Sequence, residues 1–154
     1  MDNIEFLQLG GNQLSGSLPD LTSAQQLQVF NVADNSLSGS LPASLGHLVT
    51  LEYLLLQGNS LHGNVSSSVF RLPLLRLLNV SGNSFSGTVP SEISASLGSL
   101  DLSRNQYWGT IPTTLADHTA LQLLNVSGNA LCEFQFMLFY MKYLNVCLLV
   151  CVIM

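Results

Sequence analysis

The chain has 154 residues, of which only 8% are charged and 47% are hydrophobic, and its net charge is −5. Ordinary globular proteins carry roughly 25% charged residues, so Ser, Asn, Gln, Thr and Gly must build most of this polar surface. Four basic residues cannot neutralise a nucleic-acid backbone or hold the chain on an anionic membrane, which excludes both as electrostatic partners. The length suits one domain with a sizeable core.

A repeated pattern organises the chain from residue 4 to residue 131. Each repeat reads LxxLxLxxN, first as Ile4-Leu7-Leu9-Asn12 and next as Leu27-Phe30-Val32-Asn35. The closing asparagines lie at intervals of 23, 24, 24, 22 and 24 residues, at Asn12, Asn35, Asn59, Asn83, Asn105 and Asn129. Another large apolar residue follows two positions after each asparagine. Six coincident registers indicate a solenoid of stacked coils.

The pattern predicts the structure of each coil. The Leu-x-Leu core alternates with a period of two, which predicts a short strand, and stacked strands form a parallel sheet spaced at roughly 4.8 Å. The Asn amide is expected to satisfy buried backbone groups where the chain turns inward. Glycines such as Gly39 predict a sharp turn, and prolines such as Pro42 are expected to keep the next segment from becoming a helix. We therefore expect an α/β solenoid of six coils, with a parallel β-sheet on its concave side and turns and short 3-10 segments on its convex side.

Two segments carry a more specific resemblance. The runs Leu37-Ser38-Gly39-Ser40-Leu41-Pro42 and Phe85-Ser86-Gly87-Thr88-Val89-Pro90 resemble the plant-type leucine-rich repeat, LxxLxLxxNxLSGxIPxxLGxLxxL. This repeat is found in ectodomains of plant receptor-like kinases, receptor-like proteins and polygalacturonase-inhibiting proteins. The resemblance covers residues 4–131 and departs from the pattern at Ser66, which replaces the proline, and at His62 and Trp108, which replace the Ser of Ser-Gly. It implies a right-handed leucine-rich-repeat superhelix, and an extracellular or plasma-membrane location as part of a parent receptor.

The two ends of the chain depart from that family. Its ectodomains have end caps with cysteines, whereas this chain begins inside a repeat, and its first residues form no secretory signal. We therefore predict a truncated product, in which Cys132 resembles the first cysteine of the C-terminal cap. Residues 1–133 are assigned to a solenoid of six repeats without an N-terminal cap, and residues 134–154 to a hydrophobic C-terminal tail.

This tail is long enough to cross a membrane, but its residues make insertion unfavourable. Its Leu, Ile, Val and Phe residues contribute about −0.3 to −0.6 kcal/mol each, whereas Lys142 near its centre costs roughly 2.5 to 3.5 kcal/mol. We expect the tail to collapse onto the open apolar end of the sixth repeat, with a membrane span as the less favoured alternative. A parent protein would otherwise reach the membrane through a missing segment.

No group of residues predicts catalysis, a cofactor or a metal ion. The run from Gly11 to Ser17 resembles a phosphate loop without its lysine, but its spacing recurs with the repeat and belongs to the solenoid. The three histidines lie at unrelated repeat positions, without a carboxylate or cysteine at ligand spacing. A protein-kinase signature is absent, so the kinase of a parent receptor would lie outside this chain. Three Asn-x-Ser sequons predict glycosylation sites at Asn64, Asn79 and Asn125.

The variable positions of each LxxLxLxxN segment are expected to face outward on the concave side. One of these positions is apolar in five of the six repeats. An exposed apolar stripe flanked by amides and single charges suits recognition of a peptide or protein. The predicted ligand-binding residues are Val29, Asn31, Glu52, Tyr53, Leu55, Arg76, Leu77, Asn79, Asp101 and Arg104.

Three classes of function remain open at this stage. The first is a fragment of a plant receptor-like kinase or receptor-like protein ectodomain, which binds a protein or peptide on its concave face and has a co-receptor as a further partner. The second is a secreted leucine-rich-repeat inhibitor or scaffold. The third is a nonfunctional truncated product. In none of these three classes is the chain expected to be an enzyme.

Overall fold

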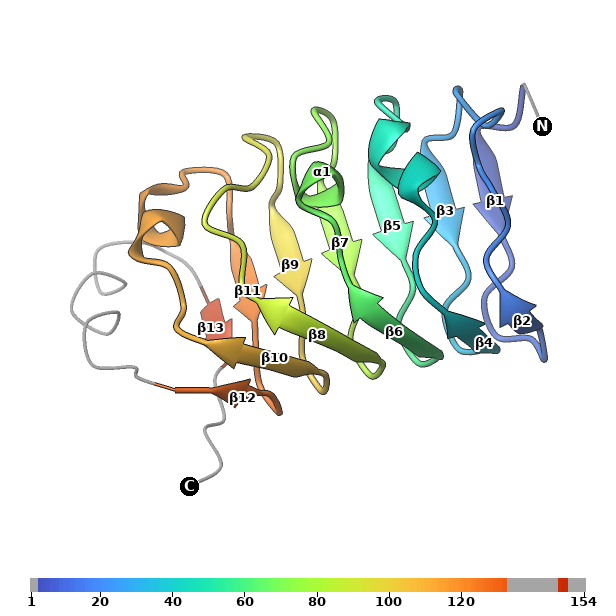
Figure 1. Ribbon diagram of the computed structural model, residues 1–154. Helices are drawn as coiled ribbons and strands as arrows, with labels where there is room; N and C mark the ends of the chain where they lie inside the picture. The colour runs from blue at the N-terminus through green and yellow to red at the C-terminus, as the bar shows by residue number, and fades with distance from the viewer. Residues whose placement is uncertain (1–2, 133–146, 150–154) are drawn as a thin grey trace.

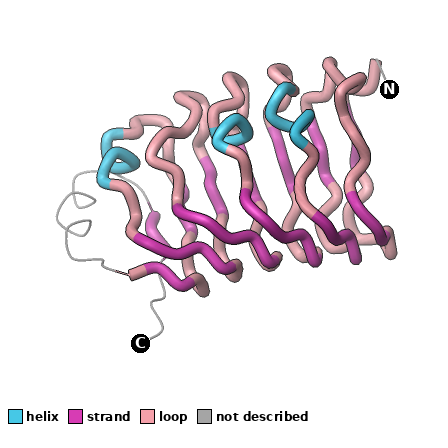
Figure 2. Tube along the Cα trace, viewed as in Figure 1, coloured by secondary structure: helices cyan, strands magenta, loops and turns pink. Residues whose placement is uncertain are grey.

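A computed structural model describes residues 3–132 and 147–149 of the chain. The chain winds into an elongated solenoid, whose coils stack side by side from the N-terminal to the C-terminal end (Figure 1). Each coil contributes one strand to each of two parallel sheets and returns through loops and short helical turns (Figure 2). The predicted fold class, a leucine-rich-repeat solenoid, is confirmed.

The first sheet is formed by the Leu-x-Leu segments, as predicted. Each strand is three residues long, and its middle residue points into the core, because successive side chains in a strand alternate between faces. The strands pair in parallel in the order β1 (Phe6–Gln8), β3 (Val29–Asn31), β5 (Tyr53–Leu55), β7 (Leu77–Asn79), β9 (Ser99–Asp101), β11 (Leu123–Asn125) and β13 (Cys147–Leu149).

A second parallel sheet is formed by the segments that follow each ladder asparagine. Sequence analysis predicted only a turn there, because Ser and Gly disfavour strands when considered alone. Coil stacking brings these segments to strand spacing, and a buried Leu, Phe or Tyr holds most of them against the core. The strands are β2 (Ser15–Ser17), β4 (Ser36–Gly39), β6 (Ser60–Asn64), β8 (Ser84–Thr88), β10 (Gln106–Gly109) and β12 (Ala130–Leu131).

Short helical turns form on the return side. Pro42 and Pro112 occupy the N-cap positions of the 3-10 helices η1 (Ala43–His47) and η2 (Thr113–Asp117). The short 3-10 segments predicted on the convex side are therefore confirmed: the fixed φ of each proline precedes a tight 3-10 turn, and neither proline is followed by an α-helix. In the third coil Ser66 replaces the proline, and its hydroxyl accepts a hydrogen bond from the Ser68 amide to cap the α-helix α1 (Ser67–Phe70).

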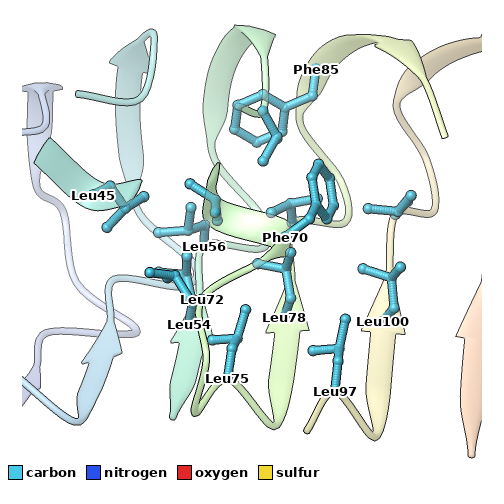
Figure 3. Close-up of a cluster of buried hydrophobic side chains, with 14 of the residues drawn as sticks. Leu45, Leu54, Leu56, Phe70, Leu72, Leu75, Leu78, Phe85, Leu97 and Leu100 are labelled. Atoms are coloured by element: carbon cyan, nitrogen blue, oxygen red, sulfur yellow. The ribbon is translucent and has the colours of Figure 1, made fainter. Parts of the chain in front are cut away.

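The hydrophobic core runs through the middle of the solenoid (Figure 3). The central residues of the first sheet, such as Leu54 and Leu78, are fully buried. They meet Phe85 from the second sheet and Phe70 from the return side. Because each coil repeats these positions, apolar columns continue from one coil to the next, and each coil buries its neighbours.

An asparagine ladder joins the coils between the two sheets. Asn83 donates from Nδ2 to the carbonyl oxygens of Val80 (3.2 Å) and Ser81 (3.2 Å) in its own coil. The same nitrogen donates to the carbonyl of Leu56 in the preceding coil at 2.9 Å, and Oδ1 accepts from the Leu61 amide at 3.0 Å. The same pattern recurs at Asn35, Asn59, Asn105 and Asn129. The predicted role of these residues is confirmed.

Replacing Asn83 with Ala should lower the free energy of unfolding by about 1–3 kcal/mol, because it strands backbone groups in two coils. Asn12→Ala is the matched control, since Asn12 donates only to Leu9 and Gly10 of its own coil. Urea unfolding followed by circular dichroism would measure both variants. Equal losses in the two variants would show that the bonds between coils contribute nothing.

Tyr107 stands where the other coils have Leu or Phe, and it is 1% exposed. Its hydroxyl is buried without a hydrogen-bond partner in the part of the chain that the structure describes. Burial raises the pKa of this phenol well above its ordinary value. Ionisation of this group therefore leaves the free energy of unfolding unchanged below a pH of about 10 and lowers it as the pH rises further, because the unfolded phenol ionises before the buried one.

Tyr107→Phe should raise the free energy of unfolding by about 1–3 kcal/mol, because it removes an unpaired buried hydroxyl. The advantage over the wild type should widen at a pH of about 11, where the unfolded wild-type phenol ionises and the buried one does not. Unfolding in denaturant at neutral and alkaline pH would measure this difference. Tyr53→Phe, which removes the hydroxyl of an exposed tyrosine, is the control. A constant difference for Tyr107→Phe across pH would contradict the account.

The predicted tail lies mostly outside the described residues. Its described part, β13, pairs in parallel with β11 and begins 24 residues after it, the interval that also separates β9 from β11. Sequence analysis predicted no strand here. Within the described residues, no helix is long and apolar enough to span a membrane.

Candidate functional site on the first sheet

The outward positions of the first sheet form two rows that cross the strands. Strand pairing places Val29 beside Tyr53, Tyr53 beside Leu77, and Leu77 beside Ser99. Two residues further along each strand, the second row runs from Asn31 through Leu55 and Asn79 to Asp101. Neighbours in such rows lie about 4.5–5.5 Å apart, so their side chains form one continuous surface.

A central apolar patch, comprising Val29, Tyr53, Leu55 and Leu77, occupies the middle of this surface. Tyr53 is its most exposed member at 37%, while the other three are half-buried. Phe6, which pairs with Val29, extends the patch onto β1 and is 60% exposed. Phe6 occupies the same repeat position as Tyr53, although it is not among the ligand-binding residues predicted from the sequence.

Charged side chains border the patch on one side. Arg76 Nε lies 3.1 Å from Glu52 Oε2. This ion pair links the residues directly before β5 and β7, next to Tyr53 and Leu77. The Arg76 side chain is 64% exposed and the Glu52 side chain 29%, so Arg76 is the more accessible of the two to a ligand. A related contact links Gln28 Nε2 to Glu5 Oε2 at 3.2 Å. The fold therefore brings together Glu52 and Arg76, two of the ligand-binding residues predicted from the sequence.

The polar residues of the second row are mostly occupied by their own turns. Asn79 Oδ1 accepts from both the amide and the hydroxyl of Ser81, at 3.0 and 2.7 Å. Asp101 accepts from the Ser103 amide with Oδ1 and from Asn125 with Oδ2. Sequence analysis did not detect this use of their oxygens, although a short polar side chain just before a turn is typical of it.

Arg104 lies apart from the other predicted residues. It falls in the turn after β9, with a φ of 52°, at a position where four of the other five coils have glycine and the second has Asp34. Its Cα lies close to Gly128 of the next coil, so the side chain stands at the rim of the sheet and not in either row. Within the described residues, no cluster of His, Cys, Asp and Glu could hold a metal ion.

Glu52→Gln should change the free energy of unfolding by only about 0–1 kcal/mol, because the ion pair lies at the surface and its Arg76 side is 64% exposed. The effect should decrease at high salt, which screens exposed charges. Arg71→Gln, which breaks the exposed Arg71–Glu92 pair at 3.2 Å on the return side, is a control of the same type. Denaturant melts at low and high salt would measure both variants, and a larger, salt-independent loss for Glu52→Gln would contradict this assignment.

Comparison with known proteins places this geometry in a family. The Leucine Rich Repeat family pattern matches residues 3–24, 26–48 and 74–95. A probable leucine-rich-repeat receptor-like serine/threonine-protein kinase of Arabidopsis thaliana is 42% identical over 48 residues, which are 31% of this chain and 5% of that protein. The chain thus spans a small part of this curated relative.

Solved structures agree with the sequence comparison. The Arabidopsis receptor kinase HAESA, solved in complex with the peptide hormone IDA and the co-receptor SERK1, matches 94% of this chain with a TM-score of 0.87 and 30% identity. This chain covers 25% of that one. A chain of the Arabidopsis BIR3–SERK2 complex matches with a TM-score of 0.72 and 34% identity, covering 84% of this chain and 70% of that chain. The chain belongs to the leucine-rich-repeat family, in the group of plant receptor-kinase ectodomains.

Proposed function

We propose that this chain is a recognition module of a plant receptor-like kinase ectodomain, which binds a peptide or protein segment on its first sheet and carries no catalytic activity. The central apolar patch supports this proposal most directly. Exposed Tyr53 and Phe6, beside Val29, Leu55 and Leu77, form an apolar surface in a protein whose outer surface is otherwise mainly polar. Water leaves such a surface readily when an apolar partner covers it.

A peptide fits this surface better than a small molecule. The outward rows run across the strands, so a bound chain would meet side chains from several coils in succession. Tyr53 and Leu77 would contact its apolar residues, since buried aromatic anchors dominate binding energy at interfaces. The peptide would find charged partners in Glu52 and Arg76, and the Asn79 amide nitrogen would be free to donate to its backbone.

The relatives support the same class of ligand. HAESA, which this chain resembles in fold, was solved with a peptide hormone and a co-receptor. By analogy, the proposed partners are a secreted peptide on the first sheet and a second receptor ectodomain. The module would act outside the cell at the plasma membrane, as part of a longer receptor. The proposed site comprises the ten residues predicted from the sequence, with Phe6 added and Asp101 and Arg104 at its edge.

The test is a selection of random peptides displayed on phage against the purified chain. A recovered peptide is synthesised and titrated against the wild type, Tyr53→Ala and Leu77→Ala. Loss of either anchor should weaken binding by about 30-fold, which corresponds to a hot-spot loss of about 2 kcal/mol.

Leu74→Ala is the matched control, because Leu74 is an exposed leucine of the same coil that lies outside the first sheet. It should leave the affinity unchanged. Peptides that bind Tyr53→Ala and Leu77→Ala as well as the wild type, or that depend on Leu74, would place the binding surface elsewhere and overturn the proposal.

A further inference from the structure

The outer face of the second sheet holds the chain's single tryptophan. Trp108 lies on β10 and is 56% exposed, which leaves a large aromatic surface in water. The strand positions around it carry hydroxyl and amide groups: Thr88 pairs with Trp108, and Ser86 pairs with Gln106 two residues earlier. An exposed aromatic ring amid uncharged hydrogen-bonding groups suits the apolar C–H face and the hydroxyls of a sugar.

A sequon asparagine lies close by on the same sheet. Asn64 is the last residue of β6, and it pairs with Ser86 on β8, the strand between β6 and β10 (Figure 1). Its Oδ1 accepts a hydrogen bond from the Ser86 hydroxyl at 3.2 Å, which turns the amide toward β8. Among the described residues, the Asn64 amide nitrogen has no hydrogen-bond partner.

Because Gly87 has no side chain, the Asn64 amide has space beside β8. A Cβ atom on Gly87 would lie 3.3 Å from Asn64 Oδ1 and 3.4 Å from its Cγ, so any side chain there would crowd the amide. Gly87 pairs with Tyr107, and Trp108 is the next residue along β10. Asn64 thus lies two strands from β10, and its amide lies beside β8, the strand that separates it from the strand carrying the tryptophan.

We propose that Asn64 carries an N-linked glycan and that the first sugar of this glycan packs on the Trp108 ring. In the modification, the Asn64 amide nitrogen forms a bond to C1 of an oligosaccharide carried on a lipid pyrophosphate. The C1–oxygen bond to the pyrophosphate breaks, the lipid pyrophosphate leaves, and the amide nitrogen loses one proton. The proposal rests on the proposed function only in requiring passage through the secretory pathway.

The other two sequons are less compatible with a glycan in the folded chain. Asn125 uses its amide nitrogen to donate to Asp101 Oδ2 at 3.1 Å, so a sugar on this nitrogen would lie against the Asp101 carboxylate. Asn79 is half-buried in the first sheet beside Leu55, where a glycan would cover the proposed ligand surface. Trp108, by contrast, is 56% exposed on the outer face of the second sheet, where a glycan on Asn64 would leave the first sheet uncovered.

The test expresses the full chain behind an added signal peptide in a plant secretory system. Glycopeptide mass spectrometry identifies the occupied asparagines, and acrylamide quenching of tryptophan fluorescence reports on Trp108 alone. An endoglycosidase that leaves the first sugar in place should not alter quenching. Removal of the whole glycan, or Asn64→Gln, should raise the quenching constant about twofold, because it uncovers the indole face. Asn79→Gln is the control and should leave quenching unchanged.

Two results would overturn the proposal: an unoccupied Asn64 in the secreted protein, or equal Trp108 quenching with and without its glycan. The readout is independent of ligand binding on the first sheet. Asn64→Gln should keep the affinity for a peptide selected as above. If the glycan shields Trp108 from acrylamide but no peptide binds the first sheet, the proposed function is refuted and the glycan proposal stands.

Discussion

At the bend between the two sheets, each coil leaves backbone groups that neither sheet can pair, and one amide side chain per coil supplies their partners. Asn59 donates to the carbonyl oxygens of Val32 and Leu56, and it accepts from the Leu37 amide of the preceding coil. An Asn has two donor hydrogens and an acceptor on a short side chain, which this arrangement requires. A buried group left without a partner costs about 1–3 kcal/mol, so the residue type at this position is strongly constrained. The asparagine ladder sets the register of one coil on the next.

That register determines what the surfaces can do. Because every coil is held in the same orientation, outward side chains at one repeat position become neighbours along the solenoid. On the first sheet this brings together Tyr53 and Leu77, and Glu52 and Arg76. On the second sheet the same geometry aligns Asn64 with Ser86, one strand away from Trp108. Both proposed sites are therefore assembled across coils, and neither exists within a single repeat.

The sequence predicted those features that depend on the repeat period alone. The first-sheet strands, the asparagine ladder and the buried leucines follow from a period that every coil maintains, and so does the placement of Glu52 and Arg76 on neighbouring coils. The second sheet could not be predicted in this way, because Ser-Gly segments become strands only after stacking supplies their partners. Residues 147–149 lack the leucine and asparagine pattern, yet they pair with β11 as a further strand. The hydrogen bonds that occupy Asn79 and Asp101 depend on side-chain rotamers, about which the repeat pattern carries no information.

The most direct test of the ladder is hydrogen exchange in the unmodified protein. The amides of Leu37, Leu61 and Phe85 each donate to the ladder asparagine of the next coil at 2.9–3.0 Å. Amides that open only when coils separate should exchange as slowly as those within the first sheet, such as Leu54. We expect this protection at all three positions. Exchange at the rate of an unstructured peptide at these amides, with the first sheet still protected, would contradict the role given to the asparagines.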